Sequence, residues 1–206
     1  MTTILLASRN AKKLTELRRV VAAAGITGLD VVGLDDVPEF AELPEDGATF
    51  EDNALIKART GAAATGLPTL ADDSGISVDA LNGMPGVLSA RWAGVRGARR
   101  DKDEANFRLL LAQLADVPAD RRGAAFVSAC ALVSAAGETV VRGEWPGIIA
   151  PGPRGSGGFG YDPVFVPVGS DRSAAELSPA EKDAASHRGR ALAALVPALG
   201  ALNRVC

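Results

Sequence analysis

Two adjacent carboxylates, Asp72 and Asp73, follow a short apolar stretch, Pro68–Ala71, and precede Ser74 and Gly75. The pattern predicts a tight turn after a buried strand. Adjacent carboxylates repel each other unless they are solvated, protonated or bound to a cation. Their hard oxygens suit Mg²⁺, and the same groups can orient or deprotonate a water. A solvated acidic turn is the alternative, but the end of a buried strand is where α/β proteins bind ligands, which favours a functional site.

A polar turn separates an apolar run at Thr3–Ala7 from a helical pattern at Ala11–Ala24, with Gly25 as its stop. The N–H groups at a helix N-terminus suit phosphate. The glycines of a Walker loop are missing, so this is a different kind of phosphate site or, on this segment alone, an ordinary polar turn. The turn itself is Ser8, Arg9 and Asn10, and the candidate phosphate segment continues into the helix with Ala11, Lys12 and Lys13.

Asn53 and Lys57 lie four residues apart in a predicted helix that begins at Thr49 and runs toward Ala64. That spacing places them on one helix face, where an amide and an ammonium can meet a phosphate chain. A solvated lysine on a helix surface is the alternative.

The glycine-rich segment Gly157–Pro163 contains two of the chain's few aromatic residues, Phe159 and Tyr161. Glycines let the backbone approach a ligand closely. Phe159 can stack on a base, and Asp162 can accept a hydrogen bond from it. The alternative is a loop that fills the core and ends in an Asp-Pro turn.

Lys182 and the sequence Ser186-His187-Arg188 place three donor-bearing side chains near one another. His187 is the only histidine, so a site built from several histidines is excluded. The donors could recognise the edge of a purine, and a solvated, charged helix end is the alternative.

Strand and helix patterns alternate along the chain, which predicts an α/β fold. The last helix has the clearest start, because Ser178-Pro179-Ala180-Glu181 forms a capping box with proline at the first helical position. Asp101 is expected to cap another helix. The remaining expected elements are a helix over Asp101–Ala115, strands around Ile76–Val78, at Ala124–Val133 and at Thr139–Arg142, and a packed terminal helix over Ala191–Leu202.

The composition is that of an ordinary globular domain, with 206 residues, 47% of them hydrophobic, and a net charge of -3. One domain, of one or two lobes, is expected. The charge argues against a general nucleic-acid binder, and we interpret Arg96, Arg99 and Arg100 as a solvated surface loop.

The two cysteines, Cys130 and Cys206, form no CxxC pair, which argues against a disulfide framework and a thiolate zinc site. Reduced cysteines fit a cytoplasmic protein. The start of the chain has no signal-peptide pattern, and no membrane span is expected.

Together these segments resemble the inosine triphosphate pyrophosphatase family, also called XTP/dITP diphosphatases. The matching pieces run in family order over nearly the whole chain: LLASRNAKKLTEL, TFEDNALIKA, ADDSG, GVLSARW, EWPGII, GGFGYDPVF and AELSPAEKDAASHRGRAL. The combination is far more specific than any one motif.

The resemblance implies an α/β fold with an elongated mixed β-sheet flanked by helices, forming one domain over residues 1–206, with two lobes and a nucleotide cleft between them. It implies a Mg²⁺-dependent homodimer. The implied reaction is hydrolysis of ITP, dITP and XTP to the monophosphate and pyrophosphate, which removes deaminated purines from the nucleotide pool.

The resemblance also implies the roles of individual residues. Asp73 is the general base, with Asp72 beside it at the metal. The third metal ligand is an acid within Pro38–Gly47, with Glu45 preferred over Glu39 and Glu42, because Pro44 stands where many relatives carry an acid. The phosphates are assigned to Ser8, where the family commonly has Thr, and to Asn10, Lys13 and Lys57, and the base to Phe159, Asp162, Lys182, His187 and Arg188. Further substrate contacts are expected from Arg9, Ala11, Lys12, Asn53, Ser74, Gly160 and Tyr161.

Two other functions are compatible with parts of this pattern. One is a related pyrophosphatase of the septum-formation inhibitor type, against which the SHR and FGYDP segments argue. The other is a nucleotide-binding sensor without catalysis, which the intact Asp72-Asp73 pair disfavours.

Overall fold

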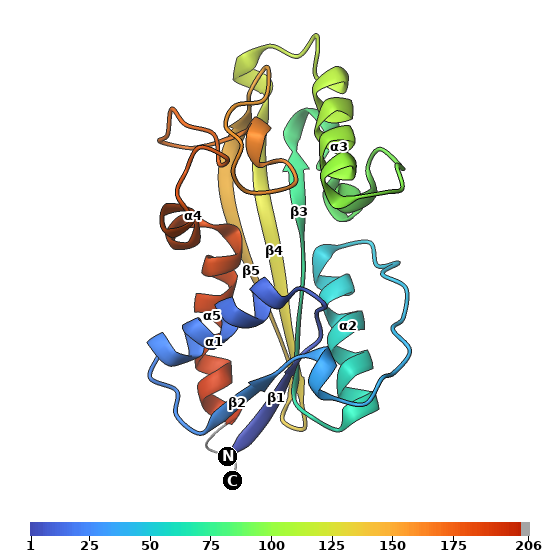
Figure 1. Cartoon of the computed structure of the whole chain (residues 1–206), viewed down its shortest axis with the longest axis vertical. Coiled ribbons are helices and arrows are strands. Elements are labelled where there is room, and N and C mark those ends of the chain that lie inside the picture. Colours follow the sequence, from blue (N-terminus) through green and yellow to red (C-terminus); the bar gives the residue numbers. More distant parts are fainter. Residues whose placement is uncertain (203–206) are drawn as a thin grey trace. The chain divides into compact units, whose positions relative to one another are not determined.

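A six-stranded sheet, with strand order β2-β1-β3-β4-β5-β6, forms the framework of the chain (Figure 1). The computed structural model describes residues 1–202, so Cys206 lies outside the described part. The strands are β1 (Thr2–Leu6), β2 (Leu29–Val32), β3 (Thr69–Val78), β4 (Gly123–Ser134), β5 (Gly137–Ile149) and β6 (Phe165–Pro167). β1 pairs in parallel with β2 and β3, whereas β5 and β6 are antiparallel. The predicted α/β fold with a mixed sheet is confirmed.

Five α-helices accompany the sheet in the described residues. They are α1 (Ala11–Ala23), α2 (Phe50–Thr65), α3 (Arg99–Gln113), α4 (Pro179–Ala185) and α5 (His187–Leu202). Short 3-10 helices lie at Leu34–Asp36, Asp79–Leu81, Gly86–Arg91, Ala119–Arg121 and Asp162–Val164.

The chain forms two compact units, each with its own core. Unit 1 comprises residues 1–73, 128–143 and 190–206, and unit 2 comprises residues 74–127 and 144–189. Unit 1 therefore contains β1, β2, α1 and α2, and unit 2 contains α3, α4 and β6. Strands β3, β4 and β5 and helix α5 contribute residues to both. The expectation of one catalytic domain with two lobes stays a prediction.

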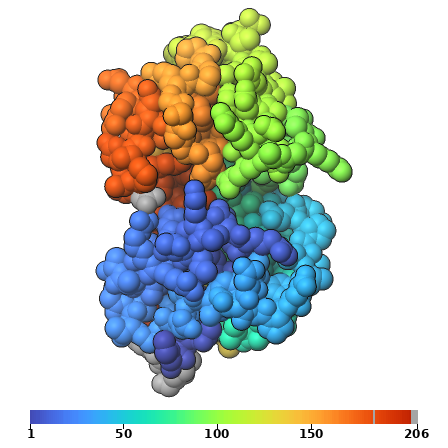
Figure 2. Space-filling model, in the orientation of Figure 1, coloured from blue at the N-terminus to red at the C-terminus, as the bar shows by residue number. Residues whose placement is uncertain are grey.

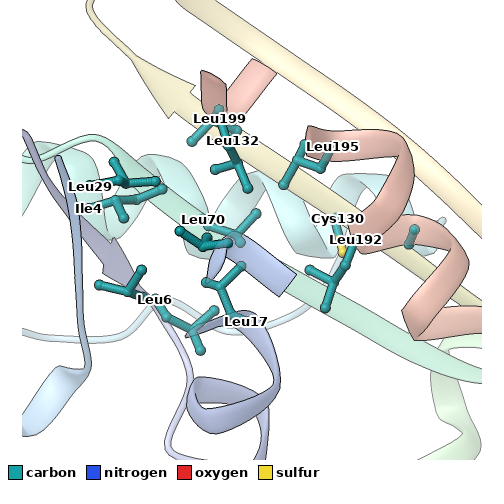
Figure 3. Close-up of a cluster of buried hydrophobic side chains, with 13 residues drawn as sticks. Ile4, Leu6, Leu17, Leu29, Leu70, Cys130, Leu132, Leu192, Leu195 and Leu199 are labelled. Carbon is teal, nitrogen blue, oxygen red and sulfur yellow. The ribbon is translucent and has the colours of Figure 1, made fainter. Parts of the chain in front are cut away.

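The core of unit 1 joins the sheet to two helices (Figure 3). Leu17 of α1 and Leu192 and Leu195 of α5 are buried together with apolar residues of four strands. On the side shown in Figure 2, the surface of this unit is formed largely by the blue N-terminal segments, including α1. The strand members of the core are Ile4, Leu6, Leu29, Val31, Leu70, Cys130 and Leu132.

The core of unit 2 contains most of the large aromatic side chains. Phe126 packs edge-on against Phe165, with ring centroids 4.5 Å apart, and Trp145 contacts Phe165 at 5.6 Å. Two leucines complete this core: Leu110 lies in α3, and Leu114 is the residue that directly follows this helix. The segment that precedes the glycine-rich loop is thus anchored in a rigid, densely packed environment.

Two predicted helix starts are confirmed. The Thr49 hydroxyl accepts the Asp52 N–H at 3.1 Å, and the Asp52 carboxylate accepts the Thr49 N–H at 3.1 Å. Ser178 and Glu181 form the same reciprocal box at α4. Helix α2 ends at Gly66, whose φ of +70° is the left-handed conformation that glycine adopts without strain.

Three expectations were wrong. Residues 72–75 form no turn, because β3 continues through them for ten residues in one strand. Asp101 is not a helix cap: α3 begins at Arg99 after Ala98, which places Asp101 in the first turn, where a carboxylate stabilises the helix dipole. β5 extends well beyond the predicted Thr139–Arg142.

Other features were not predicted from the sequence. Strands β2 and β6 were not expected, and the C-terminal helical region is divided at Ser186 into α4 and α5. None of the helices in the described part of the chain combines the length and apolarity needed to cross a membrane.

Candidate active site

Asp72 and Asp73 lie in the middle of β3, so their side chains point to opposite faces of the sheet. This alternation removes the repulsion expected of two carboxylates in one turn. Each carboxylate instead meets its own lysine within unit 1: Asp72 meets Lys13, and Asp73 meets Lys57. The two adjacent aspartates of β3 therefore form two separate ion pairs, each with a different lysine.

Both carboxylate oxygens of Asp73 are contacted from α2. The Asn53 amide nitrogen donates to Oδ2 at 3.1 Å, and the Lys57 ammonium lies 3.3 Å from Oδ1. Asn53 is completely buried, and its own oxygen accepts the Gly47 N–H at 2.9 Å. The predicted face of Asn53 and Lys57 is thus directed at the predicted general base.

Asp72 is buried, with 6% of its side chain exposed, and lies 2.7 Å from the Lys13 ammonium. Lys13 extends from the first turn of α1, whose start is capped by Asn10: its oxygen accepts the Lys12 N–H at 3.1 Å. The Ser8 hydroxyl accepts the Asn10 N–H at 3.3 Å. The polar turn is therefore shaped by its own side chains and presents the Lys13 ammonium to β3, while Ala11 and Lys12 are exposed.

The three acids considered as metal ligands have different environments. Glu42 pairs with Arg9 at 2.5 Å on the surface, which also raises the pKa of Arg9. Glu39 is exposed. Glu45 lies 3.4 Å from the Lys57 ammonium and so shares that cation with Asp73. Of the three acids, Glu45 is therefore the one that a shared lysine connects to Asp73.

In unit 2, the glycine-rich loop is folded around Asp162. Its buried carboxylate accepts the Phe159 N–H at 2.7 Å and contacts the Lys182 ammonium of α4. Gly158 has φ +73°, and a Cβ there would lie 2.0 Å from Asp162 Oδ2. This carboxylate therefore holds the loop and Lys182 together.

The Phe159 ring is 42% exposed and lies among cations. The Arg99 guanidinium carbon is 4.6 Å from the ring centroid and the Lys182 ammonium 4.9 Å from it. The alternative of a core-filling Phe159 is excluded by this exposure. Tyr161 has the opposite placement, because its ring is buried and its hydroxyl donates to the Ser89 carbonyl at 2.9 Å.

The remaining predicted base-recognition residues lie near the start of α5. His187 is buried and stacks on Phe126, with centroids 5.1 Å apart and planes inclined by 14°. Arg188 extends toward Ser74 of β3, with 3.4 Å between its Nη2 and the serine hydroxyl. The structure thus brings Arg188 and Ser74 together, although 114 residues separate them in sequence.

The donor set of unit 1 fits a divalent cation held jointly with a substrate. Asp73 and Glu45 are hard carboxylate donors, and the Lys57 ammonium already lies within 3.4 Å of both. No group of three or more acids, histidines or cysteines suited to a metal occurs among the described residues. The pair of carboxylates, Asp73 and Glu45, is compatible with Mg²⁺, because this ion usually binds one or two carboxylates and completes its coordination shell with waters and phosphate oxygens.

Comparison with known proteins decides the family. The model of the Ham1 family matches residues 4–198. The chain belongs to the Ham1 family. A dITP/XTP pyrophosphatase from Nocardia farcinica is 69% identical over 203 residues, covering 98% of this chain and 97% of its own length.

Solved Ham1-family structures agree with this assignment. The dITP/XTP pyrophosphatase from Mycobacterium abscessus has a TM-score of 0.82 at 64% identity, covering 96% of this chain and all of that one. The HAM1 protein from Coxiella burnetii has a TM-score of 0.86 at 40% identity, covering 97% and 98%. The resemblance noted in the sequence is confirmed.

Sequence reasoning missed three structural residues of this Ham1 site: Gly47, Ser89 and Asp103. A Cβ at Gly47 would lie 2.5 Å from the Asp52 Cβ. The Ser89 hydroxyl accepts the Ile76 N–H at 2.9 Å and donates to the Gly86 carbonyl at 2.6 Å. Asp103 accepts the Gly160 N–H at 2.9 Å. The only signal in the sequence was that Ser89 belongs to the GVLSARW motif, and its contacts with Ile76 and Tyr161 become apparent only in the folded chain.

Proposed function

We propose that this chain hydrolyses deaminated purine nucleoside triphosphates, ITP, dITP and XTP, to the monophosphate and pyrophosphate. The observation that carries the proposal is Asp73, whose carboxylate is fixed by Asn53 and Lys57. The names of relatives 69% and 64% identical to this chain, both dITP/XTP pyrophosphatases, support the substrate class.

In the proposed reaction, water attacks phosphorus at the α–β anhydride and that anhydride P–O bond breaks. Asp73 accepts the proton that the water loses, and the oxygen of the broken bond leaves on pyrophosphate. General-base assistance of this kind contributes roughly a hundredfold to ten-thousandfold in rate. Lys57 and Lys13 offset the negative charge of the polyphosphate, which otherwise repels the nucleophile.

We infer Mg²⁺ as the cofactor, held by Asp73 and Glu45 together with phosphate oxygens. When bound, Mg²⁺ neutralises charge that develops on the phosphate oxygens. Asp72, which the sequence also suggested as a ligand, points to the opposite face of β3 and contacts Lys13, so we assign it to positioning Lys13 and not to the ion held by Asp73 and Glu45. Ser8 and Asn10, which shape the turn before α1, are proposed to bind the phosphates with the two lysines.

The base is assigned to the cluster in unit 2. Phe159 offers an exposed ring for stacking, and Arg188, His187 and Lys182 offer donors. Hypoxanthine and xanthine carry an acceptor at position 6, where adenine carries an amino donor. A donor left unpaired by adenine costs about 1–3 kcal/mol, which gives roughly tenfold discrimination or more per group.

We further infer that the chain acts as a homodimer in the cytoplasm, without nucleic-acid or membrane partners. Sedimentation of the purified chain tests the dimer directly, because a monomer of 21.1 kDa is easily separated from its dimer.

Pyrophosphate release tests the function. The chain is incubated with ITP, XTP, dTTP, UTP and ATP in the presence of Mg²⁺ and, in parallel, of EDTA. We expect release from ITP and XTP with Mg²⁺ alone. Preference for dTTP or UTP would instead support a pyrophosphatase of the septum-formation inhibitor type. Tight ITP binding without release would support a sensor.

A further inference from the structure

Two consecutive amides of the glycine-rich loop are held by two different carboxylates. The Phe159 N–H donates to Asp162, in the loop itself, at 2.7 Å, and the Gly160 N–H donates to Asp103 at 2.9 Å. Asp103 lies in α3, 57 residues earlier in the chain. In Figures 1 and 2 the green α3 and the orange loop segment are neighbours. The backbone position of Phe159 therefore depends on a second element.

The same helix also contacts the Phe159 side chain. Arg99, one turn before Asp103, places its guanidinium carbon 4.6 Å from the ring centroid. Its Nε is 3.9 Å from Asp103 Oδ2. A guanidinium over an aromatic face is attracted by the negative face of the ring. Asp103 thus binds the loop backbone and orients the cation that lies on the ring.

The surroundings of Asp103 support a structural role in which it connects α3 to the loop. Only 25% of its side chain is exposed, whereas Arg99 is 61% exposed. Burial is the main cause of a raised pKa for the Tyr161 phenol, and the nearby Asp103 charge raises it further. Arg99 is thus exposed, as the sequence indicated, but it lies in the first turn of α3 and not in a loop, and its guanidinium lies over the Phe159 ring.

We propose that Arg99 and Asp103 are positioning residues for nucleotide recognition, which hold Phe159 where its exposed ring stacks on the purine. This inference rests on the proposed function and assigns part of its base selectivity to α3. Asp103 fixes the loop through the Gly160 amide, and Arg99 fixes the ring. Neither residue is required to touch the phosphates or the attacking water.

The test compares variants of the full chain that alter the support of Phe159 and leave the phosphate-binding residues unchanged. The variants are Arg99→Met, Arg99→Lys and Asp103→Ala. Arg100→Met and Glu104→Ala serve as matched controls, because Arg100 is the exposed neighbour of Arg99 and Glu104 pairs with Arg108. The measurements are the Kd of IMP by calorimetry, KM and kcat for ITP, and inhibition by tripolyphosphate, which has phosphates but no base.

Arg99→Met is expected to weaken IMP binding roughly twofold to fivefold, the equivalent of one exposed cation–π contact. Arg99→Lys restores most of the affinity. Asp103→Ala weakens IMP binding about tenfold, because a charge-assisted hydrogen bond to the loop is lost. In each case KM for ITP rises, kcat is unchanged, and tripolyphosphate inhibits as it does the wild type.

Three results would overturn the proposal. Unchanged IMP affinity in Arg99→Met would remove Arg99 from recognition, and tighter binding would show that Arg99 obstructs the ring. Equal losses toward IMP and tripolyphosphate in both Arg99→Met and Asp103→Ala would indicate a general structural defect. The exposed position of Arg99 makes its substitution compatible with folding. If the wild-type chain releases no pyrophosphate from ITP, the proposed function is wrong. If the wild type releases pyrophosphate and the Arg99 and Asp103 variants bind IMP as tightly as the wild type does, only the proposed role of α3 is wrong.

Discussion

The buried amide of Asn53 donates to Oδ2 of Asp73 over 3.1 Å, while its oxygen accepts the Gly47 N–H. One side chain thus connects the proposed general base to the loop that carries Glu45. The position of the carboxylate is set before any substrate arrives. Preorganisation of this kind is what a reacting group needs.

Asp73→Asn should leave the fold intact and reduce turnover of ITP by roughly a hundredfold to ten-thousandfold, because the amide cannot accept the water proton. Steady-state kinetics measure the loss, and circular dichroism with thermal melting checks the fold. Asp101→Asn, in the first turn of α3, is the control. Near-normal kcat in a folded Asp73→Asn chain would reject the role of Asp73.

Asn53→Ala should lower stability as well as turnover. The substitution removes the hydrogen bonds of the buried Asn53 amide to Gly47 and to Asp73, and each such bond contributes about 0.5–1.5 kcal/mol, or somewhat more where one partner is charged. Urea denaturation is expected to show this loss in Asn53→Ala, whereas Asp73→Asn retains the Gly47 contact. If the two variants unfold at the same urea concentration, the bridging role of Asn53 is wrong.

Arg188→Ala should reduce the preference for ITP over ATP while leaving the Mg²⁺ dependence unchanged. Arg188 contacts Ser74 and offers a guanidinium donor to the base. The ratio of kcat/KM values for the two nucleotides measures the effect, with roughly a tenfold decrease expected for one lost donor. An unaltered ratio would place base selection elsewhere.

Glu181 should make the stability of the chain depend on pH in the acid range. The Arg172 guanidinium, followed by the Ser178 N–H, lowers the pKa of Glu181 from 4.5 to about 2. Because the folded-state pKa is depressed, this stabilisation is present above pH 4.5 and is lost as the pH falls toward about 2.

Glu181→Gln keeps a capping side chain but removes the charge. The urea midpoints of the two proteins should therefore differ at pH 6 and converge on acidification. An NMR titration of the Glu181 carboxyl checks the pKa itself. A difference between midpoints that stays constant with pH would contradict the assignment.

Gly75→Ala should destabilise the protein by about 1–3 kcal/mol, because overpacking forces neighbouring groups apart. A Cβ at Gly75 would lie 2.3 Å from the Ser89 hydroxyl and 2.7 Å from the Gly86 carbonyl. Gly152→Ala is the control, since a Cβ there meets nothing within 4 Å. Equal melting temperatures of the two variants would show that the strand adapts.

The sequence predicted best what is decided locally. The capping boxes of α2 and α4 depend on residues three positions apart, so Thr49 with Asp52 and Ser178 with Glu181 were readable directly. The shared face of Asn53 and Lys57 follows from helix periodicity alone. Family resemblance added the roles that no local rule provides.

The predictions that were wrong, and the residues that were missed, depend on contacts with residues far away in the sequence. Asp-Asp-Ser-Gly has the composition of a turn, yet it is extended as part of the ten-residue strand β3, which is a neighbour of β4 in the sheet. The contacts of Asp103 with Gly160 and of Ser89 with Tyr161 span 57 and 72 residues. No spacing rule reaches across such distances, so these residues became visible only in the folded chain.

Ser89 connects its own motif, GVLSARW, to the ADDSG motif shortly before it and to the distant GGFGYDPVF motif. The Ser89 hydroxyl lies where a side chain at Gly75 would be placed. The Ser89 carbonyl accepts the hydrogen bond of the Tyr161 hydroxyl. A side chain at position 75 therefore requires a change at Ser89, whereas the bond to Tyr161 uses a backbone carbonyl that any residue at position 89 provides. Engineering that recombines these motifs from different relatives therefore has to exchange Gly75 and Ser89 together.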